Sequence, residues 1–130
     1  SKSVHALLMA RHGNAENAFD LWEESWRDYI IDQNQMLFTE IAGRDDRSYF
    51  LTGAAGCLNS WLYGFMGIRV TNEEPDDSVE LKVQLESGAW FSAEARMPDQ
   101  FNSITIDGFY LDGRPYYLGA TGYEAHLIKK

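Results

Sequence analysis

Apolar residues recur at helical spacing in the first half of the chain and alternate with polar residues in the second half. Up to Val70 they return every three or four positions, which is typical of amphipathic helices. After Val70, short runs alternate between apolar and polar positions, as in strands that bury one face. The pattern predicts an α+β chain, with helices first and a small antiparallel sheet after them.

Two helices are predicted before residue 30. The first spans the sequence "SVHALLMARHG", in which Gly13 supplies a stop, and Asn14 suits the N-cap of the second. The residues that share one face of the first helix are Val4, Leu7, Leu8 and Arg11. The apolar stripe of the second consists of Ala18, Leu21, Trp22, Trp26 and Tyr29.

A third helix is predicted after an irregular stretch that covers residues 31–51. It has the sequence "TGAAGCLNSWLYGFMGI", with Thr52 as a possible cap. Its main stripe consists of Cys57, Leu58, Trp61, Leu62 and Phe65. Other apolar residues, such as Tyr63 and Met66, lie off this stripe, so we expect the helix to be buried on more than one side.

The second half begins with a polar linker, "NEEPDDS", and continues with short strands. The segment "SVELKVQL" alternates strictly, and Asp112-Gly113 between two aromatic runs is a strong signal for a hairpin. The acids of the linker lack the regular ligand spacing of a calcium loop, so we expect no metal there. The three histidines are scattered and show no pairing typical of a metal site: they are His5, His12 and His126.

Charge and cysteine content restrict the function further. Eleven basic and twenty acidic residues give 11 − 20 = −9, which argues against a nucleic-acid or anionic-membrane partner but not against neutral ligands such as sugars. The single cysteine, Cys57, excludes an internal disulfide and is interpreted as buried filler. We predict no cofactor, and the compartment stays open.

The candidate chemistry lies between residues 36 and 56. Glu40 directly follows an apolar run, and the small residues Gly53 to Gly56 begin the third helix. A carboxylate at a cleft can act as a general base, and bare backbone at a helix start lets a ligand approach. A surface glutamate and simple close helix packing are the alternative interpretations.

The segments "FTEIAG" and "SYFLTGAAGCLNSWLYGFMGIRV" resemble the closing part of the catalytic domain of glycoside hydrolase family 65. The resemblance continues in "SVHALLMARHGNAENAFDLWEES" and in "FNSITIDGFYLDGRPYYL", so that it runs through nearly the whole chain. It implies an inverting α-glucosidase, of the kojibiose hydrolase or acid trehalase type. Residues 1–70 would be the last helices of an (α/α)6 barrel, and residues 71–130 a small C-terminal β domain.

Carried over to this sequence, the resemblance makes Glu40 the general base and places Thr52 and Gly53 beside the substrate. The general acid would belong to a remaining N-terminal segment or subunit of the same enzyme. We expect the chain to be a piece of something larger, because its three helices and small sheet cannot hide all their apolar stripes. The rival interpretations are a phosphorylase that releases β-glucose 1-phosphate, with His5 as a phosphorylase-like feature, and an acidic binding module without catalysis.

Overall fold

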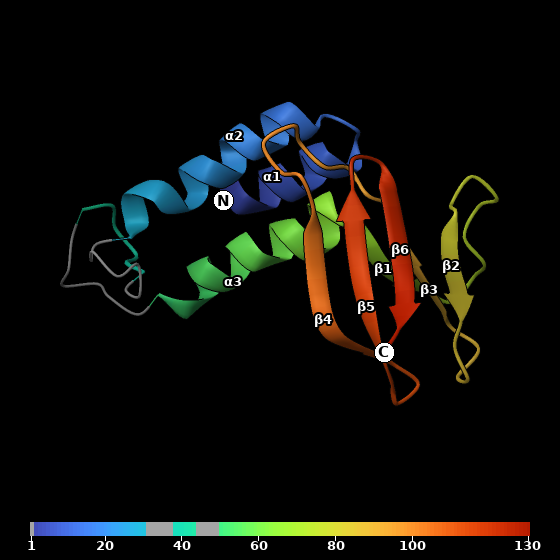
Figure 1. The fold of residues 1–130 in the computed structure, drawn as a ribbon. Helices are drawn as coiled ribbons and strands as arrows, with labels where there is room; N and C mark the ends of the chain where they lie inside the picture. Colours follow the sequence, from blue (N-terminus) through green and yellow to red (C-terminus); the bar gives the residue numbers. More distant parts are fainter. Residues whose placement is uncertain (1, 31–37, 44–49) are drawn as a thin grey trace. The chain divides into compact units, whose positions relative to one another are not determined.

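The chain divides into two compact units, each described here by itself. The computed structural model describes residues 2–30, 38–43 and 50–130. The helical unit covers Ser1–Gly64 and the β unit covers Phe65–Lys130 (Figure 1). A mixed α+β chain with helices first is therefore confirmed, whereas the assignment of residues 1–70 to a barrel and of 71–130 to a β domain stays a prediction.

The described residues of the helical unit form three α-helices, drawn from blue to green in Figure 1. They are α1 (Lys2–Arg11), α2 (Ala15–Trp26) and α3 (Leu51–Asn59). A short 3₁₀ turn, η1 (Arg27–Tyr29), follows α2, and a π-helical segment, η3 (Ser60–Phe65), continues α3. Of the irregular stretch predicted over residues 31–51, residues 31–37 and 44–49 lie outside the described residues.

The turn between α1 and α2 has the predicted stop and cap. Gly13 has a φ of +83°. Its N–H donates to the carbonyl of Ala10 at 2.9 Å, and the N–H of Asn14 donates to the carbonyl of Met9 at 3.0 Å. This pair of bonds is the Schellman motif, which a glycine stabilises by accepting a left-handed conformation. Asn14 then caps α2, because its side-chain oxygen accepts a bond from the N–H of Asn17 at 3.3 Å.

Small residues, and not the predicted apolar stripe, form the buried face of α1. Its buried residues are Ser3, Ala6 and Ala10. Val4 and Leu8 of the predicted stripe are exposed by 53% and 47%. The exposed part of the stripe agrees with the expectation that this chain cannot hide all its apolar residues by itself.

The close approach of α1 to α3 explains why small residues are buried. The Oγ of Ser60 donates a 2.8 Å bond to the carbonyl of Ser3. A Cβ atom on Gly56 would stand 2.7 Å from the Oγ of Ser3, and one on Gly64 would stand 3.1 Å from the Cα of Leu7. Residues 56, 60 and 64 follow each other at intervals of four, so they face α1 as one row.

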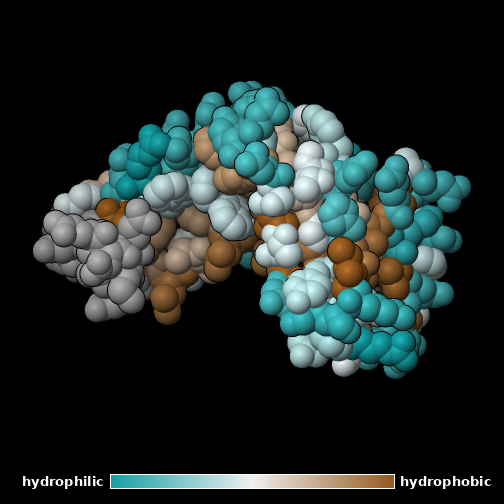
Figure 2. All heavy atoms as spheres, viewed as in Figure 1, coloured by the Kyte–Doolittle hydropathy of each residue, from teal (hydrophilic) through white to brown (hydrophobic). Residues whose placement is uncertain are grey.

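The start and the stripe of α3 differ from the prediction. The helix begins at Leu51 after Phe50, so Thr52 is not its cap. Leu58 of the predicted stripe is 60% exposed, so part of the stripe faces outward, and Leu51 at the start of the helix is 76% exposed. Figure 2 shows hydrophobic atoms at the surface along this helix. Trp61 does pack inward, with its ring centroid 5.6 Å from that of Trp22 on α2.

The β unit contains two three-stranded antiparallel sheets where a single sheet was predicted. Their strand orders are β1-β3-β2 and β4-β5-β6. The strands of the first sheet are β1 (Ile68–Thr71), β2 (Leu81–Gln84) and β3 (Trp90–Ala93). Those of the second are β4 (Ile104–Leu111), β5 (Arg114–Thr121) and β6 (Glu124–Lys129). Of these, β1 and β3 were not anticipated.

Asp112 and Gly113 form the predicted hairpin between β4 and β5. Both take a positive φ, 49° and 75°, as a tight two-residue turn requires. A carboxylate oxygen of Asp112 also accepts a 2.9 Å bond from the N–H of Glu86, in the turn after β2. Phe91 of β3 and Phe109 of β4 pack with centroids 5.3 Å apart, which joins the two sheets in one core. No helix among the described residues is long and apolar enough to cross a membrane.

Candidate active site

The backbone directly before Glu40 is fixed by hydrogen bonds to neighbouring elements. The N–H of Thr39 bonds to the carbonyl of Tyr29 at 2.8 Å, and the N–H of Phe50 bonds to that of Phe38, also at 2.8 Å. Thr39 itself is fully buried, whereas Glu40 is exposed. Glu40 is therefore an accessible carboxylate on a short segment held between the end of α2 and the start of α3.

Glu40 lines a pocket of about 280 Å³ in the helical unit. The pocket lies at the first turn of α1, the end of α2 and the start of α3. Its lining residues are Lys2, Ser3, Ser25, Tyr29, Phe38, Glu40, Phe50 and Gly53. The structure thus brings Glu40 and Gly53 of the predicted site into one pocket, although 12 residues lie between them in the sequence.

Aromatic rings form one side of this pocket, and Gly53 leaves room for them. The rings of Tyr29 and Phe38 stack with centroids 5.9 Å apart and an interplanar angle of 7°. A Cβ atom on Gly53 would stand 2.7 Å from Cδ1 of Phe50 and 2.8 Å from Cε1 of Phe38. The glycine is therefore required by the packing of the two phenylalanines, one of which lies two residues before Glu40.

The other small residues of the motif serve other purposes. Thr52 is exposed and is not among the residues that line the pocket. Gly56 packs on Ser3, so close helix packing explains this glycine. Of the predicted site residues, only Glu40 and Gly53 line the pocket.

Charge near Glu40 is supplied by Lys2. Its ammonium group forms a 2.7 Å ion pair with Glu24 of α2. This hydrogen bond and the charge of Glu24 raise the pKa of Lys2, so the side chain is a cation at neutral pH. The pocket therefore carries one cation and one acid, and most of the rest of its lining is uncharged.

Cys57 is better explained by packing than by reactivity. Burial raises the pKa of its thiol above the ordinary value, against the lesser effect of a hydrogen bond with Ser25. Its sulfur lies 3.3 Å from the Oγ of Ser25. A thiol that holds its proton is a poor nucleophile. Among the described residues, no three histidine, cysteine or acidic side chains are grouped as a metal site requires.

The pocket contains residues that the sequence did not single out as site residues, and they come from several parts of the helical unit. Ser25 of α2 and Tyr29 of η1 lie at helical spacing and look like ordinary amphipathic positions. Phe38 and Phe50 could have been found from their spacing, since each lies two or three residues before Glu40 or Gly53. Lys2 carries no signal in the sequence that separates it from a solvated surface residue.

Comparison with known proteins finds a distant similarity. A kojibiose hydrolase from Mucilaginibacter mallensis is 24% identical over 118 residues, which is 91% of this chain. The chain spans 15% of the length of that relative. No protein-family model and no solved structure matches this chain. The similarity indicates a distant relationship to a glycoside hydrolase.

Proposed function

We propose that this chain is the C-terminal part of an inverting glycoside hydrolase that cleaves α-glucosides, and that Glu40 is its general base. The single observation that carries the proposal is the position of Glu40 beside Gly53 in the pocket at the helix starts. The similarity to a kojibiose hydrolase points to the same class of reaction, with α-linked disaccharides as substrates.

The geometry around Glu40 suits activation of a water molecule. A general base must hold its carboxylate at a reproducible position with its lone pairs open to the cleft. The N–H groups of Thr39 and Phe50 each make a 2.8 Å hydrogen bond that fixes the backbone before Glu40. Glu40 itself is exposed. In the proposed reaction it removes the proton from water as the oxygen attacks the anomeric carbon, so the product has the opposite anomeric configuration.

The rest of the enzyme would supply the general acid. Inverting glycosidases hold their two carboxyl groups about 6.5–9.5 Å apart, so that the water fits between base and substrate. We assign the acid to the remaining N-terminal segment or subunit. That segment would also cover the apolar residues that α1 and α3 leave exposed, which are Val4, Leu8, Leu51 and Leu58.

The test uses the whole enzyme with Glu40→Gln. Loss of the base should reduce kcat by about 10²–10⁴-fold, while circular dichroism shows an unchanged fold. Glu40→Ala with added azide should recover turnover and give the β-glucosyl azide. Glu124→Gln, an exposed glutamate of β6, is the matched control and should leave kcat unchanged.

Other results would redirect the proposal. Near-normal turnover of Glu40→Gln would remove Glu40 from the mechanism. If turnover of the unmodified enzyme depends on added phosphate and yields β-glucose 1-phosphate, the enzyme is a phosphorylase. Nuclear magnetic resonance of the first product formed distinguishes inversion, which gives β-glucose, from retention.

A further inference from the structure

Tyr29 lines the same pocket as Glu40, and hydrogen bonds hold the two chain segments together. The carbonyl of Tyr29 accepts a 2.8 Å bond from the N–H of Thr39. The carbonyl of Asp28 accepts a 3.2 Å bond from the N–H of Gly43. The short segment that carries Glu40 is therefore held, before and after the acid, against η1, of which Tyr29 is the last residue.

The ring of Tyr29 has a fixed orientation, because it stacks on Phe38. The two ring centroids are 5.9 Å apart and the two planes differ by 7°. Phe38 is held in turn by its close packing on Gly53 at the start of α3. The Tyr29 ring is half-buried, and a ring held in this way has little conformational freedom left to lose when a ligand packs on it. Tyr29 is therefore a preorganised part of the pocket wall.

The phenol hydroxyl of Tyr29 adds a third kind of polar group to the ammonium of Lys2 and the carboxylate of Glu40. The hydrogen bond and the charge of Glu24 are the main causes of the raised pKa of Lys2, and an electrostatic interaction with Tyr29 adds to them. A phenol both donates and accepts hydrogen bonds, whereas an ammonium group only donates and a carboxylate only accepts. The wall of the pocket therefore offers donors and acceptors together.

The size and the lining of the pocket suit a single sugar ring. Its volume of about 280 Å³ lies just below the range of small-molecule sites, about 300–1,000 Å³. A pyranose has an apolar face of C–H groups and a rim of hydroxyls, so it matches a wall that combines aromatic rings with polar groups. Phe38 and Phe50 supply only apolar surface, whereas Tyr29 presents an apolar body and a polar tip.

We propose that Tyr29 is a substrate-binding residue that positions the glucose unit next to Glu40. This inference rests on the proposed function, since it takes Glu40 as the general base and glucose as the sugar. The Tyr29 ring packs on the C–H face of the glucose, and its hydroxyl bonds to one of the sugar hydroxyls. The hydrogen bonds between η1 and the segment of Glu40 then keep the sugar and the base at one spacing, as attack by water requires.

A purely structural role for Tyr29 makes a different prediction. Tyr29→Phe keeps the ring that stacks on Phe38 and the backbone bonds, and it removes only the hydroxyl. If Tyr29 only supports Phe38, this variant should bind sugar as the unmodified enzyme does. If the hydroxyl contacts the sugar, the affinity should fall about two- to tenfold, as loss of one hydrogen bond predicts.

The experiment measures the Kd of glucose for the whole enzyme by nuclear magnetic resonance titration. Glucose is the probe because every α-glucoside contains it and because its binding needs no turnover. Tyr29→Phe should raise this Kd about two- to tenfold. Tyr29→Leu, which also removes the ring, should raise it further. Tyr123→Phe, at an exposed tyrosine of the β unit, is the matched control and should leave the Kd unchanged.

Deoxy sugars test the contact directly, in a cycle with Tyr29→Phe. The series consists of 2-deoxyglucose, 3-deoxyglucose, 4-deoxyglucose and 6-deoxyglucose. One of them should lose affinity for the unmodified enzyme, and Tyr29→Phe should not weaken its binding further. If Tyr29→Phe weakens glucose and all the deoxy sugars by the same factor, or weakens none of them, the hydroxyl does not contact the sugar and the proposal is overturned.

The outcomes separate this proposal from the catalytic one. If Glu40→Gln abolishes hydrolysis while Tyr29→Phe leaves the Kd of glucose unchanged, Glu40 keeps its role and Tyr29 is not a substrate-binding residue. If the cycle assigns a sugar hydroxyl to Tyr29 while Glu40→Gln retains turnover, Tyr29 binds the sugar and another group is the base.

Discussion

Gly53 lies so close to Phe38 that a Cβ atom on the glycine would stand 2.8 Å from Cε1 of the phenylalanine. Substitution by alanine therefore forces the rings of Phe38 and Phe50 apart. We expect Gly53→Ala to lose about 1–3 kcal/mol to overpacking, offset by about 1 kcal/mol of helix propensity. Because Phe38 precedes Glu40 by two residues, kcat should fall about tenfold, measured with the whole enzyme.

Gly56→Ala is the matched comparison on the same helix. Its Cβ would meet the Oγ of Ser3 at 2.7 Å, and this hydroxyl can rotate away, whereas a phenylalanine ring cannot move without displacing its neighbours. The loss of stability in urea should be smaller than for Gly53→Ala. An equal loss of kcat in both variants would show that Gly53 has no special effect on Glu40.

Gly67 is the position in the β unit where a side chain should be tolerated least. Its φ is +65°, and a Cβ atom would stand 2.0 Å from the carbonyl oxygen of Glu94. We expect Gly67→Ala to cost about 3 kcal/mol or more in urea unfolding, from the left-handed backbone and the overlap together. Gly122→Ala, at φ +54° with open space around it, should cost only about 1 kcal/mol.

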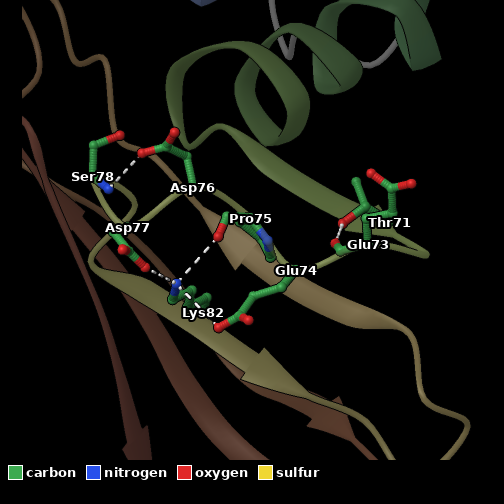
Figure 3. A network of polar contacts seen from close by, with 8 residues as sticks. All are labelled: Thr71, Glu73, Glu74, Pro75, Asp76, Asp77, Ser78 and Lys82. Carbon is green, nitrogen blue, oxygen red and sulfur yellow. Dashed lines mark hydrogen bonds and ion pairs between the residues drawn. The ribbon is translucent and has the colours of Figure 1, made fainter.

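Lys82 of β2 holds the loop between β1 and β2 by ion pairs with Glu74 at 3.3 Å and Asp77 at 3.4 Å (Figure 3), and this loop should loosen at alkaline pH. Desolvation lowers the pKa of Lys82, but hydrogen bonds and charge from Glu74 and Asp77 outweigh it, so the folded pKa lies above the ordinary 10.5. The contribution is therefore complete below pH 10.5 and is lost as the pH rises through the raised value. Thermal unfolding between pH 9 and 12 should show a smaller decline for Lys82→Met than for the unmodified chain.

Two further measurements define the role of Lys82. At neutral pH, Lys82→Met should speed amide hydrogen exchange at Ser78 and Val79, whose N–H groups bond within the loop. Lys129→Met removes an exposed lysine of β6 and serves as the control. Unchanged exchange at Ser78 in Lys82→Met would mean that the loop holds its shape without the lysine.

The exposed leucines of α3 should make the isolated chain associate. Leu51 and Leu58 are 76% and 60% exposed, and apolar residues clustered in this way favour contact with another surface. We expect residues 1–130 alone to sediment as more than a monomer, and Leu58→Gln to reduce this association. Ile128→Gln, on β6 and 58% exposed, should not reduce it.

In the proposed whole enzyme, Leu58→Gln should be harmful, because it should lower the stability of the protein. If the remaining segment covers α3, Leu58→Gln will lower stability by about 1–2 kcal/mol, whereas Ile128→Gln will stay within about 0.5 kcal/mol. A chain that is monomeric, cooperatively folded and unaffected by Leu58→Gln would favour a freestanding module and contradict the proposed larger enzyme.

Local signals in the sequence predicted the turns well, because turns depend on a few adjacent residues. Gly13 and Asn14 form the stop and cap between α1 and α2, and Asp112 with Gly113 forms a hairpin. The proximity of Glu40 and Gly53 in one pocket was also anticipated, although from a resemblance and not from spacing.

Features that depend on how elements approach each other could not be predicted in this way. Hydrophobicity favours Val4 and Leu8 as the buried side of α1, but close contact with α3 requires small side chains, so Ser3 is buried instead. The strand β3 was missed because it is short and carries Ser92 among apolar neighbours.

The row of small residues at 56, 60 and 64 has a consequence for the pocket around Glu40. It sets the spacing of α1 and α3, and each of these helices contributes its first turn to the pocket wall, through Ser3 and Gly53. A larger side chain at Ser60, two helical turns away from Gly53, would splay the two helix starts and change the shape of the pocket. The dimensions of this pocket can therefore be altered from a position that is not part of its wall.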